Sequence, residues 1–251
     1  MPLNNQSFIC PQWPAPNNVK AFSSTRQGGQ SLAPFTSLNL GAHVGDEWEH
    51  VKQNRLNFAK QIGMPNSLRW LNQVHGTHTC DLPSDEMGDI AADASFTKVK
   101  GQVCAVMTAD CLPLLVCNQA GTQVAACHAG WRGLCDGVIE SCIAKFDETD
   151  TLMVWLGPAI GANAFEVGAE VRQAFVDKQA SAIEAFQPSH NEGKWLADIY
   201  LLAKQRLALL GVEQIYGASF CTYSDEERFF SYRRDNQTGR LASVIWIEED
   251  Q

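Results

Sequence analysis

Three polar side chains stand inside or at the edge of apolar stretches of this 251-residue sequence, and their types indicate a metal site. His75 lies in the segment WLNQVHGTH, Cys111 in MTADCLPLL and His128 in AACHAGWRG. Two imidazoles and one thiolate suit zinc, and three protein ligands leave a fourth position for water or substrate. A metal there lowers the pKa of that water, so that hydroxide forms near neutral pH. We therefore expect zinc, with copper as the alternative metal, on these side chains.

The same residues allow other interpretations, which their spacing leaves open. They are structural if both histidines are satisfied within strands and the cysteine is a buried free thiol. Alternatively, Cys111 is a nucleophile with His128 or His75 as its base, as in thiol hydrolases. Asp110 would then be the orienting carboxylate, although neighbouring residues of a strand point to opposite faces.

A redox role would use the same ligands. Two histidines, one cysteine and a soft axial ligand describe a blue-copper centre. Multicopper oxidation, however, requires many more imidazoles in His-x-His pairs, and this chain has six histidines and no such pair. The histidine count therefore ranks a copper oxidase below the other interpretations.

Arginines beside glycine-rich turns are candidates for binding an anion. In Gly130-Trp-Arg-Gly133, the turn opens a predicted helix and presents backbone N–H groups, and Arg132 adds a two-pronged donor. Arg26, in the segment SSTRQGG, is a second cation beside a flexible glycine pair. Each would be an ordinary exposed turn arginine if no anion binds.

Three further residues are candidates for contacting a substrate. His43 lies in the glycine-rich segment NLGAHVGD and is a candidate for proton transfer. Tyr232 and Arg233 lie in the C-terminal segment CTYSDEERFFSYRRD, which is dense in aromatic residues and arginines. Such a segment is suited to stacking a ring and binding a phosphate, and its aromatic residues equally suit a core.

The elements that must position these residues are short strands and helices. Strands are predicted over 103–108, 114–117, 123–128, 152–156, 214–218 and 241–247. Helices are predicted over 136–146, 166–178 and 195–210, the last from apolar residues at three- and four-residue steps with Gly211 as its stop. Strands and helices mixed without strict alternation predict a layered α/β or α+β fold.

Length and composition bound the fold and the partners. The chain is 45% hydrophobic and 19% charged, which suits one large globular domain or two small ones. Its net charge of -9 argues against nucleic acid or an anionic membrane as a partner. A small anionic ligand held by two or three local arginines remains compatible with that charge. The sequence shows no sign of an obligate protein partner.

The sequence also predicts a cytoplasmic protein. The N-terminal segment MPLNNQSFICPQWPAP has no basic start followed by an apolar run, so no secretory signal is expected. The longest apolar stretch, over 103–117, is interrupted by Asp110 and Pro113 and is too short to span a bilayer. The nine cysteines form no obvious disulfide framework, so we expect reduced thiols.

Taken together, the motifs resemble a family variously called laccase-domain proteins, multicopper polyphenol oxidases, peptidoglycan-editing factors and purine nucleoside phosphorylases. The resemblance covers nearly the whole chain. It is carried by the segments Ser24-Thr-Arg26-x-Gly-Gly29, Asn39-Leu-Gly-x-His-Val-Gly-Asp46, Asn72-Gln-Val-His75-Gly, Thr108-Ala-Asp-Cys111-Leu-Pro, His128-Ala-Gly-Trp-Arg-Gly133, Gly157-Pro-x-Ile, Phe165-Glu-Val-Gly168, Cys221-Thr and Phe230-Ser-Tyr-Arg-Arg234.

The resemblance implies a fold and a site. The implied metal ligands fall on His75, Cys111 and His128. The implied fold is a single-domain α/β sandwich with a mixed sheet over residues 1–251, similar to a fold of cysteine hydrolases. The catalytic set expected on this basis is the metal trio with Arg132, while Arg26, His43, Tyr232 and Arg233 are expected to bind substrate.

The family names imply three different activities, which physical argument can rank. A zinc-bound water is suited to attack C6 of adenine, and an anion pocket is suited to phosphorolysis. We therefore expect a purine nucleoside phosphorylase that cleaves adenosine, inosine or methylthioadenosine with phosphate and also deaminates adenosine. The alternative is a hydrolase that edits peptidoglycan precursors with Cys111 as nucleophile. A copper-dependent polyphenol oxidase ranks third.

Overall fold

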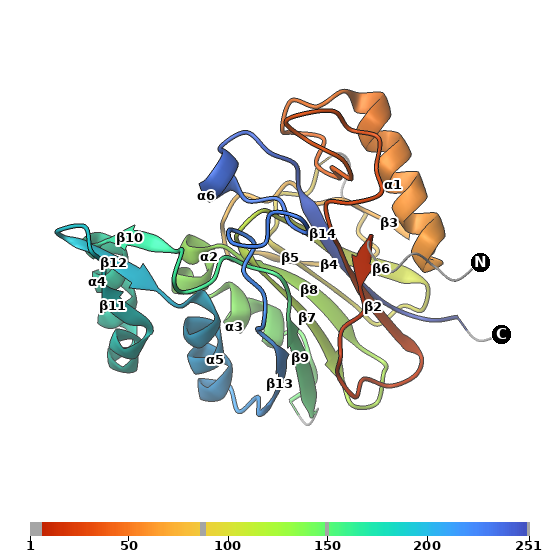
Figure 1. The fold of residues 1–251 in the computed structure, drawn as a ribbon. Helices are drawn as coiled ribbons and strands as arrows, with labels where there is room; N and C mark the ends of the chain where they lie inside the picture. The colour runs from red at the N-terminus through yellow and green to blue at the C-terminus, as the bar shows by residue number, and fades with distance from the viewer. Residues whose placement is uncertain (1–6, 86–88, 149–150, 250–251) are drawn as a thin grey trace.

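Two β-sheets lie face to face at the centre of the molecule, with helices on their outer faces (Figure 1). The structure, a computed structural model, describes residues 7–85, 89–148 and 151–249. Residues 1–6, where the segment examined for a secretory signal begins, lie outside the described residues. Among the helices of the described ranges, none combines the length and the apolar character that crossing a membrane requires.

Both large sheets are mixed, as predicted. The first has the strand order β1 (Phe8–Ile9), β2 (Val19–Ser24), β14 (Leu241–Ile247), β6 (Gln102–Thr108) and β3 (Ser67–Leu68). The second has the order β13 (Gln214–Gly217), β9 (Leu152–Leu156), β7 (Leu112–Asn118), β8 (Val124–Ala129), β5 (Ala94–Thr97) and β4 (Thr79–Asp81). Neighbouring strands are antiparallel except in the pairs β3–β6, β4–β5 and β9–β13.

Three apolar layers hold the sheets and helices together. The cluster between the two sheets includes Val106 of β6 and Ala126 of β8. The outer face of the first sheet packs against Phe58 of α1 (Trp48–Ile62). The outer face of the second sheet packs against α2 (Trp131–Asp136), α3 (Val138–Ile143), α4 (Ala169–Lys178) and α5 (Ile199–Leu209). The result is the layered α/β sandwich that the sequence predicts.

All six predicted strands are confirmed, with ends that shift by at most two residues. The helix predictions were too long. The helix predicted over 136–146 is α3, which is shorter at both ends and is preceded by α2. The other two predicted helices begin too early. Residues 166–168 form β10 (Glu166–Gly168), and the start of the segment 195–210 belongs to β12 (Lys194–Ala197), because these strands pair with each other and with β11 (Phe186–Pro188). The helix α5 begins after Asp198, whose carboxylate caps it by accepting from the N–H of Leu201.

The described fold also contains elements that the sequence patterns did not predict. These include the long helix α1, the N-terminal strands β1 and β2, the edge strands β3, β4 and β5, the 3₁₀ helix Ala180–Ala185 and the one-turn helix α6 (Tyr232–Asp235). All nine cysteines are free thiols, as expected.

Candidate metal centre

The pairing of β7 with β8 brings two of the three predicted ligands together. In this antiparallel pair, Leu112 lies opposite Ala129 and Pro113 lies opposite His128. Cys111 directly precedes β7, so its thiol reaches the end of β8 where His128 lies. Both strands are buried along their whole length against the core, so they hold the backbone at Cys111 and His128 in a fixed position.

The third ligand comes from a loop. His75 lies between the bridge of Asn72 with Ala91 and the strand β4. Its ring is perpendicular to that of His128, with 4.9 Å between the ring centroids. The Nε2 of His75 is 3.9 Å from the Sγ of Cys111, and the three donor atoms all lie within 4.8 Å of one another. The structure therefore assembles the trio that the sequence predicts.

Asp93, a residue that the sequence analysis missed, orients two of the ligands. Its carboxylate is 2.8 Å from the Nδ1 of His128, so the Nε2 of that ring is left to face the other ligands. It also accepts hydrogen bonds from the successive backbone N–H groups of Val74, His75 and Gly76. The positive φ of His75, 59°, turns the chain so that these three groups converge on one carboxylate.

Gly130 leaves the space that the three side chains occupy. A Cβ at this position would lie 2.7 Å from the Cδ2 of His75 and 3.1 Å from the Sγ of Cys111. Real Cβ atoms do not approach a ring carbon that closely, so any other residue here would displace the ligands. Gly130, which the sequence places in a predicted anion-binding turn, thus also leaves room for the side chains of the trio.

The electrostatics of the trio favour a thiolate. Burial raises the pKa of the Cys111 thiol, but the charge and hydrogen bonds of His128 and His75 outweigh it and lower that pKa to about 6. Burial lowers the pKa of His128, but Cys111 and Asp93 outweigh it and raise that pKa to about 9. Burial also raises the pKa of Asp93, while hydrogen bonds from His128 and from the backbone bring it below its usual value.

The donor set and its spacing fit a metal ion. Tetrahedral zinc with its usual bond lengths holds a sulfur and a nitrogen ligand about 3.6 Å apart, close to the separation of Cys111 and His75. A carboxylate behind a histidine ligand, such as Asp93 behind His128, is the usual support of such a site. Among the described residues, this trio is the one group of three or more histidine, cysteine or acidic side chains with that geometry.

The trio lines a cavity of about 400 Å³, which is large enough for a small organic molecule. His43 and Tyr232, two of the predicted substrate-binding residues, line the same cavity. Arg240 also lines it and was missed by the sequence analysis. Like Asp93, it stands at the edge of an apolar strand, which is the signal that singled out Cys111 and His128.

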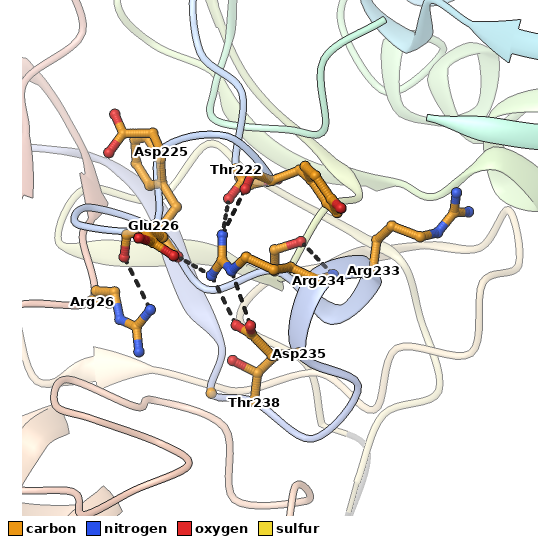
Figure 2. Close-up of polar contacts among 12 residues, drawn as sticks. Arg26, Thr222, Asp225, Glu226, Arg233, Arg234, Asp235 and Thr238 are labelled. Atoms are coloured by element: carbon orange, nitrogen blue, oxygen red, sulfur yellow. Dashed lines mark hydrogen bonds and ion pairs between the residues drawn. The ribbon is translucent and has the colours of Figure 1, made fainter. Parts of the chain in front are cut away.

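Two other predicted substrate-binding residues form hydrogen bonds with the backbone outside the cavity. Arg26 donates to the backbone oxygens of Thr36 and Glu226, and Arg233 donates to the backbone oxygen of Glu166. Neither lines the cavity of the trio. Figure 2 shows Arg26 directed at the backbone of Glu226 and Arg233 directed away from that contact. In this structure both arginines hold loops in place.

The C-terminal segment that carries Tyr232 is held by Arg234 and Asp110. Arg234 donates to the backbone oxygens of Thr222, Tyr223 and Phe229 and pairs with Asp235, as Figure 2 shows in part. The Asp110 carboxylate accepts from the hydroxyl of Thr222 and from the N–H of Arg233, each at 2.6 Å. Asp110 therefore does not orient His128, and Asp93 takes the place considered for it.

Arg132 is not among the residues that line the cavity of the trio. Its exposed guanidinium stacks on Trp131, 4.4 Å from the ring centroid, and lines a separate pocket with Cys135 and Lys178. The helix that Gly130 opens, α2, spans six residues. The predicted phosphate role of Arg132 would thus require an anion outside the cavity of the trio.

Comparison with known proteins matches the chain over its whole length. The family model described as multi-copper polyphenol oxidoreductase laccase matches residues 20–248. The chain is 56% identical over 241 residues to a protein of Escherichia coli named purine nucleoside phosphorylase YfiH, covering 96% of this chain and 98% of that one. It is 51% identical over 242 residues to a Haemophilus influenzae protein named purine nucleoside phosphorylase, covering 96% and 99%.

Solved structures give the same result. A crystal structure of a Neisseria meningitidis protein, NMB0706, superimposes with a TM-score of 0.91 at 47% identity, covering 97% of this chain and 100% of that one. The crystal structure of YlmD from Geobacillus stearothermophilus superimposes with a TM-score of 0.84 at 28% identity, covering 98% and 97%. The sandwich thus recurs in these solved structures, and this chain belongs to the family described as multi-copper polyphenol oxidoreductase laccase.

Proposed function

We propose that this chain is a purine nucleoside phosphorylase that acts on adenosine, inosine and methylthioadenosine, and that its zinc site also deaminates adenosine. The names of relatives that are 50% identical or more over nearly the whole chain support the phosphorylase activity. The deaminase activity and the substrates are our own extension. They rest on the chemistry of the residues around the trio.

One observation carries the proposal: the metal trio opens onto a cavity that also holds an aromatic ring and a cation. Tyr232, which is 56% exposed, offers a face on which a purine can stack at the cavity mouth. Arg240 supplies positive charge within the same cavity. A nucleoside needs both kinds of contact, because its base is flat and apolar on its faces while phosphorolysis brings in an anion.

In phosphorolysis, an oxygen of phosphate bonds to C1′ of the ribose while the bond from C1′ to N9 of the purine breaks. The electron pair of that bond stays on the purine, which takes up the proton that phosphate loses. The products are the free purine and ribose 1-phosphate. Zinc held by His75, Cys111 and His128 would supply a Lewis acid that polarises a water molecule or a purine atom.

In deamination, the oxygen of a water molecule bonds to C6 of the adenine ring. The bond from C6 to the amino nitrogen breaks, ammonia leaves with one proton of the water, and the other proton goes to N1 of the purine. The chain's contribution is positional: Asp93 fixes the ring of His128, and the backbone from Val74 to Gly76 fixes His75.

A specific observation also favours the second candidate, a thiol hydrolase acting on peptidoglycan precursors. Cys111, His128 and Asp93 form the chain of nucleophile, base and orienting carboxylate that such enzymes use. The lowered pKa of Cys111 would keep its sulfur ionised at neutral pH. A copper oxidase fits less well, because the described residues contain one three-ligand group and multicopper oxidation needs several.

Product analysis with and without a chelator separates these activities. Zinc-loaded protein is incubated with adenosine, with and without phosphate, and the products are separated by chromatography. We expect adenine and ribose 1-phosphate with phosphate, and inosine without it. Chelation and Cys111→Ala should each lower both rates by about 100-fold or more. Cleavage of a peptidoglycan precursor that survives chelation would favour the thiol hydrolase instead.

Cys221→Ala is the matched control for Cys111→Ala. Cys221 is also half-buried, and although burial raises the pKa of its thiol, hydrogen bonds from Ser224 and the backbone lower it below the usual value. It does not line the cavity of the trio. We expect this variant to keep wild-type rates, so an equal loss in both variants would argue against a special role for Cys111.

A further inference from the structure

The cavity of the trio adjoins a second cavity. This second cavity, of about 320 Å³, shares His43, Gln73 and Met107 with it as wall residues. Gln73 is held rigidly, because its side-chain amide donates to the backbone oxygen of Met107 and accepts from the N–H of the same residue. The two cavities therefore adjoin each other at His43, Gln73 and Met107, and together they are called the cleft below.

Arg55 lies in the second cavity with its guanidinium already positioned. The guanidinium lies 4.3 Å from the ring centroid of Trp70 and 5.8 Å from that of Trp48, and its Nε donates to the backbone oxygen of Leu40. Burial lowers the pKa of Arg55 to about 10, so the side chain remains charged at neutral pH. Its two terminal nitrogens have no acceptor among the residues that the structure describes.

Arg240 lines the first cavity together with His43. Its Nη1 donates to the backbone oxygens of Thr238 and Gly239, while its Nε and Nη2 have no acceptor within the described ranges. Burial lowers the pKa of His43, and the charges of Arg240 and Arg55 lower it further. A neutral imidazole thus lines both cavities and feels the charge of the guanidinium group in each.

Within the part of the chain that the structure describes, neither arginine has a counter-ion. In residues 7–85, 89–148 and 151–249, no carboxylate forms an ion pair with Arg55 or Arg240, although both are half-buried. By contrast, half-buried Arg206 and Arg234 pair with Glu140 and Asp235. Asp89 lines the second cavity but is exposed and forms no ion pair with Arg55. Burying charge without a partner is costly, so this cleft favours an anion.

We propose that His43, Arg55 and Arg240 form an oxyanion subsite that holds a phosphate group beside the metal trio. The shared chemistry is a tetrahedral oxyanion, either free inorganic phosphate or the phosphate of a nucleotide. Each guanidinium group donates two hydrogen bonds to the phosphate oxygens. Neutral His43 accepts a hydrogen bond from the hydroxyl group that the phosphate retains. The catalytic use of this subsite rests on the proposed function. In phosphorolysis, a phosphate oxygen held at the subsite bonds to C1′ of the ribose while the bond from C1′ to N9 breaks. The purine leaves with the proton that the phosphate loses.

Binding of inorganic phosphate tests the subsite without catalysis. Equilibrium dialysis with labelled phosphate is run on wild type, Arg55→Gln and Arg240→Gln, each treated with a chelator to remove any contribution of a metal. We expect each arginine variant to bind at least about 10-fold more weakly than wild type. Arg55→Lys, which keeps the charge, should recover part of the affinity, and circular dichroism confirms that each variant folds.

Arg172→Gln is the matched control. Its guanidinium stacks on Trp195 at 4.3 Å, the same distance as Arg55 from Trp70, but it does not line either cavity. It should bind phosphate like wild type. Phosphate binding that falls in Arg132→Gln and is unchanged in Arg55→Gln and Arg240→Gln would overturn the proposal in favour of the turn before α2.

Further measurements distinguish free phosphate from a nucleotide as the ligand, and distinguish failure of the subsite from failure of the proposed phosphorylase activity. Adenosine 5′-monophosphate that binds through both arginines, while inorganic phosphate does not bind, would assign the subsite to a nucleotide. Phosphate that binds through both arginines in a protein without phosphorylase activity would support the subsite and contradict the proposed function. Phosphorolysis with an unchanged KM for phosphate in both arginine variants would support the function and overturn the subsite.

Discussion

At the scale of single residues, Asp93 explains why the metal trio has the arrangement it does. One buried carboxylate accepts from the Nδ1 side of His128 and from three successive backbone N–H groups around His75. It therefore orients one ligand through its ring and another through its backbone. Cys111, the third ligand, gains its thiolate character from the two histidines.

Asp93→Asn should weaken both metal binding and folding. The amide keeps the shape but loses the charge, and its NH₂ group cannot accept from the backbone. We expect roughly 10- to 100-fold weaker zinc binding and a loss of roughly 2–3 kcal/mol in the free energy of unfolding. Metal titration and urea denaturation measure the two effects. Asp81→Asn is the control, because Asp81 forms only an exposed ion pair with Lys145 and should cost at most about 1 kcal/mol.

The pH dependence of alkylation tests the state of Cys111 in protein stripped of metal. Its thiol has a pKa of about 6, whereas burial raises that of exposed Cys10 above the ordinary value near 9. Cys111 should therefore react rapidly with iodoacetamide at pH 7, and its rate should fall as the pH drops through about 6 and the sulfur takes up a proton. Mass spectrometry follows each cysteine. A midpoint near that of Cys10, or no protection by added zinc, would contradict this assignment.

At the scale of elements, the site depends on where β7 begins and where β8 ends. Their register places Cys111 beside Gly130, and the glycine leaves room for His75 to close the group from its loop. Hydrogen bonds from Arg234 and to Asp110 fix the segment from Thr222 to Asp235. This segment places Tyr232 in the wall of the cavity.

Gly130→Ala should disrupt the metal site without disrupting the sandwich. The new methyl group would lie 2.7 Å from a ring carbon of His75 and 3.1 Å from the sulfur of Cys111, so the ligands must move apart. We expect zinc affinity to fall by at least about 10-fold while the circular dichroism spectrum is unchanged. Gly161→Ala is the control, because its methyl group would crowd Cys221 at a similar distance. Equal zinc affinity in the two variants would show that Gly130 is not needed for space.

The sequence predicts the strands of this fold better than its helix starts. Buried strands such as β6 and β9 are continuous apolar runs, which a pattern detects without knowing the partner strand. The start of α5 was predicted too early, because Trp195 and Leu196 match a helical period but pair as a strand with Val167 and its neighbours. Which strands become neighbours depends on long-range pairing, and the sequence does not show it.

The same contrast holds in the site. The trio was predictable because histidine and cysteine are unusual at the ends of apolar strands. Asp93 and Arg240 carry the same signal, a charged residue beside an apolar strand, and could have been found by it. That Arg26 binds the backbone oxygen of Glu226, and Arg233 that of Glu166, could not have been predicted, because these acceptors lie 200 and 67 residues away in sequence.

At the scale of the whole molecule, the cleft is locally positive although the protein as a whole is negatively charged. The chain carries a net charge of -9, but the cleft concentrates Arg55, Arg240 and the metal trio. Its wall residues range from Ala42 to Arg240, and the C-terminal strand β14 lies between β2 and β6 in the first sheet. The cleft therefore requires both ends of the described chain, and its local positive charge suits an anionic co-substrate in an otherwise acidic protein.

The most direct test of the phosphorylase proposal is the stoichiometry of its products. Zinc-loaded protein is incubated with inosine and labelled inorganic phosphate, and hypoxanthine and labelled ribose 1-phosphate are quantified together. Phosphorolysis predicts that the two products appear in equal amounts, that neither forms without phosphate, and that Cys111→Ala forms neither. Free ribose formed without phosphate, or no product from fully loaded wild-type protein, would contradict it.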